Sequence, residues 1–343
     1  MNKLKDLPRI RLTRSVFPIV LLIFSALFVT MLSSCSSAPL ASTGKKIPVI
    51  LDTDIGDDID DMWSLVMMLN SPEFDVKLIT VGVGDTLTKA KVVAKTLQIA
   101  GRTDIPIGIG PKIGDRICYY QDWVRDYQFS NYPGTVYQDG IKALIDTIMN
   151  AKRKPKLIAI GPLVNIAAAL DIEPEIAKNC EYIGMQGSIY RGYNNSPEIS
   201  PEHNVKLYTK ETQKVFTADW PMIITPLDTC GIVRIEGDKY QKVLRSNKPL
   251  AKAIIECYRY WVKTINLEQF SLEDIDVKST IMYDSVAVYL AARTELVKLE
   301  RLGIRVDDQG YTRIDEKAKK MDCAVEWNDL DAFEDFLVER IIK

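Results

Sequence analysis

Histidine is almost absent from this chain of 343 residues, because His203 is the only one. Catalytic or metal sites that need two or more histidines are therefore excluded. Cysteine is also sparse: there are six, and no two are closely spaced, which excludes a disulfide framework and a cysteine-based zinc site. We expect the five cysteines beyond residue 35 to be buried thiols. They are Cys118, Cys180, Cys230, Cys257 and Cys323.

The chain also lacks a strong net charge. It has 44 Lys and Arg residues against 46 Asp and Glu residues, a formal charge of −2. The first 34 residues are basic, so the remainder is net acidic, and no basic surface for nucleic acid is expected. The hydrophobic fraction of 47% and the charged fraction of 26% are typical of a globular protein with a sizeable core.

One long hydrophobic run is present, near the N-terminus. Basic residues between Lys3 and Arg14 precede an uncharged stretch at 16–32, which is slightly short for a transmembrane helix. The stretch ends in Leu-Ser-Ser-Cys35, which resembles a bacterial lipobox, in which the cysteine is lipidated. We expect residues 1–34 to be a lipoprotein signal peptide and Cys35 to be the lipidation site. The alternative is an uncleaved signal anchor.

A flexible tether at 35–46 and a single domain at 47–343 would follow the signal peptide. The predicted location is outside the cytoplasm. The chain would be an exported, membrane-anchored bacterial lipoprotein, in the periplasm or at the cell surface.

Apolar β-like runs alternate with helical patterns along this domain. The alternation predicts an α/β fold, with an open, mostly parallel sheet and helices on both of its faces. Strands are expected at 47–51, 76–83, 156–160, 182–185 and 222–225, and a strand pair around 304–314. Helices are expected at 60–69, 88–100, 136–149, 163–170, 208–217, 250–266 and 279–292.

The most informative segment is an acidic loop directly after the first predicted strand. Ligands of open α/β sheets bind beyond the carboxyl ends of the strands. Clustered carboxylates repel one another, and a hard cation such as Ca²⁺, which takes oxygen ligands, would stabilise them best. The alternative is a solvated acidic cap on the next helix. The six aspartates are Asp52, Asp54, Asp57, Asp58, Asp60 and Asp61.

Two familiar acidic motifs do not fit this loop. An EF-hand that starts at Asp52 needs Gly and Glu where the chain has Asp57 and Trp63. The Asp-x-Asp strand end is also similar to that of the haloacid-dehalogenase phosphatases, with Asp52 as nucleophile. That family has Thr or Val where this chain has Gly56.

Asp-Thr-Asp-Ile-Gly at 52–56, followed by acidic residues and an apolar helix, resembles the inosine-uridine-preferring nucleoside hydrolase family. Further segments match that family in order, from about residue 47 to residue 290. They are 82–90, 160–167, 200–204, 226–229 and 282–287. The resemblance implies hydrolysis of the N-glycosidic bond of ribonucleosides, as in purine or pyrimidine salvage, and a small-molecule ribonucleoside as the partner.

The resemblance also implies a calcium site with a ribose site beside it. Asp54 would act as general base on a water held by the ion. The implied calcium ligands are Asp54, Asp61, Asp284 and the backbone carbonyl of Ile160. The implied substrate-binding residues at the ribose 2′ and 3′ hydroxyls are Asp60, Asn204 and Asp284. Glu202, with Asn194 or Asn195, would contact the 5′ hydroxyl. Asp85, which stands where the family usually has Asn, is the last implied substrate-binding residue.

The chain departs from the family in two places. The loop is two residues longer than the commoner pattern; without a gap, Asp58 would take the ribose role of Asp60. The family's leaving-group histidine is Tyr283 here, a weaker acid because the pKa of tyrosine is near 10. Tyr283 is therefore expected to be either the leaving-group acid or a wall of the pocket. His203, where the family has Phe, is expected to be a wall.

A second functional class stays open because the leaving-group histidine is missing. In that alternative the protein is a non-catalytic, calcium-dependent ribose- or nucleoside-binding lipoprotein. A homo-oligomer is expected in either case. Aromatic residues in the polar stretch 114–132 and in the helical pattern at 258–261 are expected to pack locally or to stack on a base.

Overall fold

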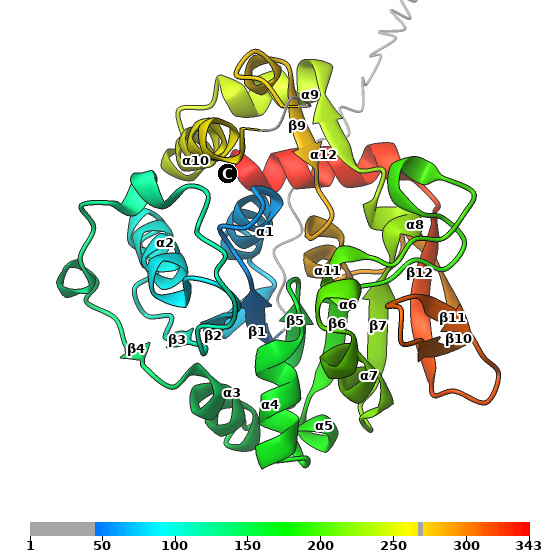
Figure 1. Cartoon of the computed structure of the whole chain (residues 1–343). Helices are drawn as coiled ribbons and strands as arrows, with labels where there is room; N and C mark the ends of the chain where they lie inside the picture. The colour runs from blue at the N-terminus through cyan, green and yellow to red at the C-terminus, as the bar shows by residue number, and fades with distance from the viewer. Residues whose placement is uncertain (1–44, 267–269) are drawn as a thin grey trace, which may run out of the picture. The chain divides into compact units, whose positions relative to one another are not determined.

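The computed structural model describes residues 45–266 and 270–343. Within these residues the largest sheet has ten strands, in the order β11-β10-β12-β7-β6-β5-β1-β2-β3-β4 (Figure 1). β10 alone runs in the direction opposite to the other strands of this sheet, so the expected open, mostly parallel sheet is confirmed. The strands are β1 (Ile47–Thr53), β2 (Phe74–Val81), β3 (Ile107–Ile109), β4 (Val136–Tyr137), β5 (Lys156–Ala159), β6 (Glu181–Met185), β7 (Met222–Thr225), β10 (Val297–Val306), β11 (Thr312–Ile314) and β12 (Lys320–Trp327).

Strand β1 lies where the order of the strands reverses. The chain adds β2, β3 and β4 on one side of β1 and then returns to place β5 on the other side. Leu51 of β1 lies opposite Ile79 of β2 and Ile158 of β5, and both pairings are parallel. Such a reversal opens a crevice beyond the carboxyl ends of the two central strands. The acidic loop follows β1 and therefore begins at this crevice.

Helices cover both faces of the sheet, as expected. Side chains alternate along β1, so Val49 and Leu51 join one hydrophobic cluster and Ile50 joins the other. The first cluster packs against α1 (Asp60–Leu69), α2 (Thr86–Ile99), α8 (Leu227–Cys230), α9 (Gly237–Leu244), α10 (Pro249–Ile265), α11 (Ser285–Leu290) and α12 (Leu330–Ile341). The second packs against α3 (Gly140–Met149), α4 (Val164–Ile172), α5 (Ile176–Asn179), α6 (His203–Leu207) and α7 (Thr209–Thr217) (Figure 1).

Two predicted helices begin later than their patterns suggested. The segment 136–149 opens with β4, and its helix starts only at Gly140, because Asp139 accepts a hydrogen bond from the backbone N–H of Lys142 and caps it. The segment 279–292 opens with β9 (Lys278–Ile281), which pairs antiparallel with β8 (Arg234–Glu236), and α11 follows. The predictions were wrong there because a tertiary pairing overrides the local pattern. The described part of the chain also contains four short 3₁₀ helices: η1 (Gln121–Val124), η2 (Phe129–Asn131), η3 (Tyr193–Asn195) and η4 (Asp274–Asp276).

The strand pair near residues 304–314 is confirmed, since β10 and β11 pair antiparallel around a turn. The five cysteines after residue 44 are all free and buried, as predicted. Across the part of the chain that the structure describes, no helix has both the length and the apolar character to cross a bilayer. The predicted signal peptide, Cys35 and nearly all of the tether lie outside the described residues.

Candidate active site

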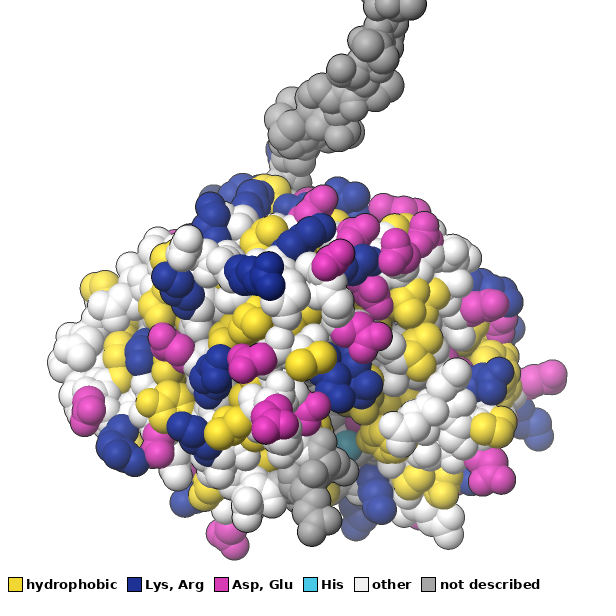
Figure 2. Space-filling view, turned by 90° about the horizontal axis from the view of Figure 1, so that it is seen from above, with side chains coloured by type: hydrophobic (Ala, Val, Ile, Leu, Met, Phe, Trp, Pro, Cys, Tyr) yellow, Lys and Arg dark blue, Asp and Glu magenta, His cyan; other side chains and the backbone are white. Residues whose placement is uncertain are grey.

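A cleft of about 750 Å³ lies where β1, β5 and β6 end. Its walls come from the acidic loop, the ends of β5 and β6, η3, the start of α6 and the segment before α11. Figure 2 shows the hollow on this face, with basic and hydrophobic side chains at its edge. Most of the residues singled out in the sequence line this one cleft. They are Asp54, Asp60, Asp61, Ile160, Asn194, Glu202, Asn204, Tyr283 and Asp284.

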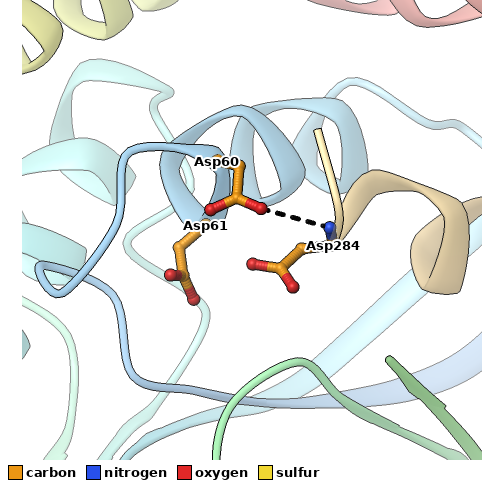
Figure 3. A group of neighbouring side chains, drawn as sticks. All are labelled: Asp60, Asp61 and Asp284. Carbon is orange, nitrogen blue, oxygen red and sulfur yellow. Dashed lines mark hydrogen bonds between the residues drawn. The ribbon is translucent and has the colours of Figure 1, made fainter. Parts of the chain in front are cut away.

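Three aspartates form a group at the bottom of the cleft, here called the carboxylate trio: Asp60, Asp61 and Asp284. One oxygen from each lies within 4.8 Å of the others. Asp60 and Asp61 open α1, whereas Asp284 directly precedes α11, and the three side chains point toward a common space (Figure 3). The backbone N–H of Asp284 donates to Asp60 Oδ2 over 3.4 Å, and the Thr53 hydroxyl donates to Asp61. All three side chains are buried.

The electrostatics of the trio suit a divalent cation. Burial raises the pKa of each carboxyl well above its usual range, and repulsion between the neighbouring carboxylates raises it further. Among residues 45–266 and 270–343, no lysine or arginine forms an ion pair with Asp60, Asp61 or Asp284. Buried carboxylate oxygens without a protein cation are the donors that a hard ion such as Ca²⁺ prefers. The residues therefore fit a metal ion.

Asp54 and Ile160, the other two expected metal ligands, lie beside the trio. The Asp54 carboxylate packs so closely on Gly161 that a Cβ there would be 2.6 Å from Asp54 Oδ1, which restricts residue 161 to glycine. Burial, followed by repulsion from Asp57, raises the pKa of Asp54 to about 7. The backbone carbonyl of Ile160 accepts a 3.3 Å hydrogen bond from Asn204 Nδ2. Asn204 is thus held against the expected metal site.

Two further aspartates of the loop have separate environments. Asp52 is held at the end of β1, where its Oδ1 accepts hydrogen bonds from Asn165 Nδ2 (2.8 Å) and from the Thr80 hydroxyl (2.5 Å). Asp58 lines the cleft and accepts a 2.6 Å hydrogen bond from the backbone N–H of Ile59. Burial raises the pKa of Asp58 to about 6. Asp58 and Asp60 both reach the cleft, but only Asp60 belongs to the trio.

Glu202 and one of the two asparagines expected at the 5′ hydroxyl line the cleft together. Glu202 caps α6, and its carboxylate accepts from the backbone N–H groups of Asn204 (2.7 Å), Gly187 (3.2 Å) and Val205 (3.3 Å). Burial raises the pKa of Glu202 to about 7.

Of the two candidate asparagines, Asn194 lines the cleft, whereas Asn195 lines a second cavity of about 530 Å³. Asn194 has a φ of 57°, a left-handed conformation that asparagine tolerates better than most residues.

Asp85 is not among the cleft-lining residues in the described part of the chain. Instead, it caps α2 by accepting hydrogen bonds from the backbone N–H (3.2 Å) and the hydroxyl (2.7 Å) of Thr88. The structure thus shows a helix-capping contact for Asp85, and the substrate contact that the resemblance implied stays a prediction.

Several aromatic rings line the cleft. Tyr283 packs edge-on against Tyr193, with 6.2 Å between the ring centres, and Trp261 packs edge-on against Phe270 at 4.8 Å. Burial raises the pKa of Tyr283 above its usual range. Tyr119 and Trp261, which the sequence left between packing and stacking, both line the cleft.

Sequence reasoning did not single out several of the lining residues, notably Arg116 and Arg234. Arg116 belongs to the polar stretch at 114–132, which was noted only for its aromatics. His203 lines the cleft, as expected of a wall, and Arg116 Nη1 lies 3.1 Å from its Nε2. Because arginine can only donate, Nε2 is the acceptor and the proton of the neutral ring is on Nδ1.

Comparison with known proteins is consistent with this site. The sequence model of the inosine-uridine preferring nucleoside hydrolases matches residues 49–335. A probable uridine nucleosidase 2 of Arabidopsis thaliana is 26% identical over 304 residues, which are 83% of this chain and 91% of the relative. A non-specific ribonucleoside hydrolase, RihC, of Klebsiella pneumoniae is 27% identical over 278 residues, 77% of this chain and 85% of the relative.

Solved structures of such enzymes share the fold. A plant nucleoside hydrolase, PpNRh1, superposes with a TM-score of 0.72 at 22% identity, over 87% of this chain and 99% of its own. A purine-preferring ribonucleoside hydrolase from Gardnerella vaginalis gives a TM-score of 0.69 at 20% identity, over 86% and 98%. With the family model matching most of the chain, the protein belongs to the inosine-uridine preferring nucleoside hydrolases, enzymes that hydrolyse N-glycosyl bonds.

Proposed function

We propose that the protein hydrolyses the N-glycosidic bond of ribonucleosides, to ribose and free base, with calcium as its cofactor. The observation that carries this proposal is the buried trio of Asp60, Asp61 and Asp284, which shares a cleft with Asn204 and the end of β5. Relatives that are named as ribonucleoside hydrolases and as a uridine nucleosidase support the class of substrate.

The metal site would consist of the carboxylates of Asp54, Asp61 and Asp284 and the carbonyl of Ile160, with Asp60 alongside. When bound, a calcium ion supplies positive charge that lowers the pKa of a neighbouring water and attracts the ribose hydroxyls. The oxygen-only donor set supports calcium over metals that prefer sulfur or imidazole ligands.

Side chains of the protein would supply the general base and the contacts to the ribose hydroxyls. Asp54 accepts the proton of the attacking water. Asp60, Asn204 and Asp284 hydrogen-bond the 2′ and 3′ hydroxyls, and Glu202 with Asn194 faces the 5′ hydroxyl. Cleavage builds positive charge on the sugar, so carboxylates beside the ring stabilise the transition state more than the neutral substrate.

Departure of the base requires a separate group. The chain's only histidine lies against Arg116 rather than before Asp284, where Tyr283 stands. We propose Tyr283 as the proton donor to the leaving base. The aromatic wall that it forms with Tyr193 supplies a surface on which a base can stack.

A turnover screen over the common nucleosides tests the proposal. Release of free base with calcium, and none after chelation, is the expected result. The alternative function, calcium-dependent binding of ribose or nucleoside without catalysis, predicts heat of binding in calorimetry but no base released from any nucleoside. Activity on p-nitrophenyl phosphate with none on p-nitrophenyl riboside would favour a phosphatase and contradict both readings.

We also propose that the enzyme is exported and held at a membrane through lipid on Cys35. A single acyl chain binds membranes only marginally, whereas several chains hold firmly. Cys35→Ser is expected to move the protein to the soluble fraction. A variant that stays in the membrane with its N-terminus intact would show that residues 16–32 are an anchor instead. A homo-oligomer is proposed as well, and light scattering of the purified domain tests it.

A further inference from the structure

The proposed reaction leaves one buried charged side chain without a role. The Lys89 side chain, in α2, is completely buried, and its ammonium nitrogen lies 2.6 Å from Asp57 Oδ1. Lys89 Nζ also donates to the backbone carbonyl of Asp54 over 2.9 Å and to that of Gly82 over 3.4 Å. A lysine is rarely buried in this way unless it is paired. Its ammonium group therefore joins the loop after β1 to the loop after β2.

The contact with Asp54 connects Lys89 to the chemistry. The hydrogen bond goes to the backbone of Asp54, while the carboxylate of the same residue packs on Gly161. The two contacts hold Asp54 from opposite ends, one at its main chain and one at its side chain. A base that is held in this way loses little entropy when it must face the attacking water.

The ion pair with Asp57 compensates one of the negative charges of the acidic loop. Asp57 also pairs with Arg116, 3.2 Å away, and its backbone carbonyl accepts a 3.2 Å hydrogen bond from Trp261 Nε1. Arg116 is one-third exposed, whereas Lys89 is not exposed at all, so Lys89 is the stronger partner in a low-dielectric setting. Asp57 is thus neutralised by protein cations, unlike the carboxylates of the trio.

The start of α2 fixes where Lys89 stands. Asp85 caps this helix, and its backbone carbonyl accepts a 3.0 Å hydrogen bond from the N–H of Lys89 itself. The backbone N–H of Asp85 in turn donates to the carbonyl of Arg116 over 2.9 Å. The helix cap therefore places both cations that flank Asp57.

We propose that Lys89 is a positioning residue for the hydrolysis: it holds the backbone of Asp54 so that the carboxylate faces the cleft, and it neutralises Asp57. The inference rests on the proposed function, because it gives Asp54 the role of base. The two parts of the role are separable, since one acts through a carbonyl and the other through a carboxylate.

Lys89→Met removes the ammonium group and keeps most of the side-chain length. It leaves Asp57 buried with only Arg116 as partner, so both the melting temperature and kcat should fall. The double variant Asp57→Asn/Lys89→Met removes the uncompensated charge as well. Its melting temperature, measured without calcium, should recover part of the loss, because the uncompensated charge is gone while the backbone carbonyls of Asp54 and Gly82 still lack the donor.

The position of Asp54 is not restored by the second substitution. In the double variant, kcat at saturating calcium should therefore stay about tenfold or more below that of the wild type, because small displacements of a reacting group are costly. The calcium affinity of the double variant, measured by calorimetry, should be weaker than that of the wild type. Its KM for the nucleoside should change little. The variant Asp57→Asn/Lys89→Gln keeps a side-chain N–H donor at position 89, so it should recover part of kcat. It also replaces the methionine variant if that variant does not fold.

Lys239→Met is the matched control. Lys239 joins α9 to α12 through Asp331 (2.6 Å) and Glu334 (3.2 Å), away from the cleft, so its loss should lower the melting temperature without changing kcat. Recovery of kcat and calcium affinity together with the melting temperature in the double variant would overturn the inference about Asp54. A wild-type protein that releases no base from any nucleoside would instead contradict the proposed function.

Discussion

The backbone N–H of Asp284 donates a hydrogen bond to the carboxylate of Asp60, which lies 224 positions earlier in the chain. The contact joins the start of α1 to the start of α11 at the bottom of the cleft. The N-terminus of α1 carries a partial positive charge, which favours the two aspartates that open it. One helix end cannot balance three buried carboxylates, and this imbalance underlies the predictions that follow.

Asp61→Asn preserves shape and removes one charge of the trio. We expect calcium affinity to be lost and turnover to fall about a hundredfold or more, because the charge stabilisation at the reacting sugar goes with it. Without calcium, the variant should melt at a higher temperature than the wild type, because one source of repulsion is gone. Calorimetry and base release measure the two effects, and a variant that keeps normal calcium affinity would remove Asp61 from the site.

Asp85→Ala separates a helix cap from a substrate contact. Loss of the cap on α2 should cost about 1 kcal/mol of unfolding free energy. KM for nucleosides should stay unchanged, because Asp85 bonds Thr88 rather than lining the cleft. Denaturant unfolding and steady-state kinetics check the pair of outcomes. A rise in KM with unchanged stability would restore the substrate role that the resemblance implied.

Tyr283→Phe tests the leaving-group donor. General acid assistance contributes roughly a hundredfold or more, so turnover on natural nucleosides should fall by about that factor. Hydrolysis of p-nitrophenyl riboside should hardly change, because p-nitrophenolate leaves without a proton. Equal losses on both substrates would show that Tyr283 only shapes the wall that it forms with Tyr193.

The sequence predicts the sheet and two members of the trio, Asp60 and Asp61, because these depend on local patterns. Alternating strands and helices define the fold class, and the acids after β1 must lie at the carboxyl edge of the sheet. Asp284, more than 200 residues away, was placed beside them by the resemblance of the segment 282–287 and not by any local pattern. The β8–β9 pairing went unpredicted because it depends on segments more than 40 residues apart.

Lys89 illustrates what a sequence does not reveal. A lysine in a helical pattern looks the same whether it faces solvent or, as here, is buried against Asp57. Asp85 illustrates a second case, because its alignment with a family position suggested a substrate contact, while the contact that the structure shows is a helix cap. The Asp85-x-x-Thr88 spacing carried that capping signal.

The stability of the metal-free protein should depend on pH. Burial raises the pKa of Asp58 to about 6 and that of Asp54 to about 7, from 3.8 in an unfolded chain. A carboxyl group with a raised folded pKa binds its proton more tightly when folded, so its stabilising effect is lost as the pH rises through the folded pKa. In chelator, the melting temperature should fall between about pH 5 and pH 8.

Calcium should reduce or reverse that fall, because the ion binds the ionised carboxylates. The difference between the calcium and chelator series is the informative quantity, since Asp52 and Glu202 titrate in both. If the melting temperature changes with pH in the same way in calcium and in chelator, no ion binds among the loop carboxylates.

Titration of metal-free enzyme with calcium, with bound ion and released base measured in the same sample, tests the central claim most directly. The account predicts no base release at zero calcium and a rate that rises in proportion to occupancy until a single ion is bound per chain. The rate should then saturate. Full turnover in the presence of chelator, with no metal bound to the protein, would contradict the account.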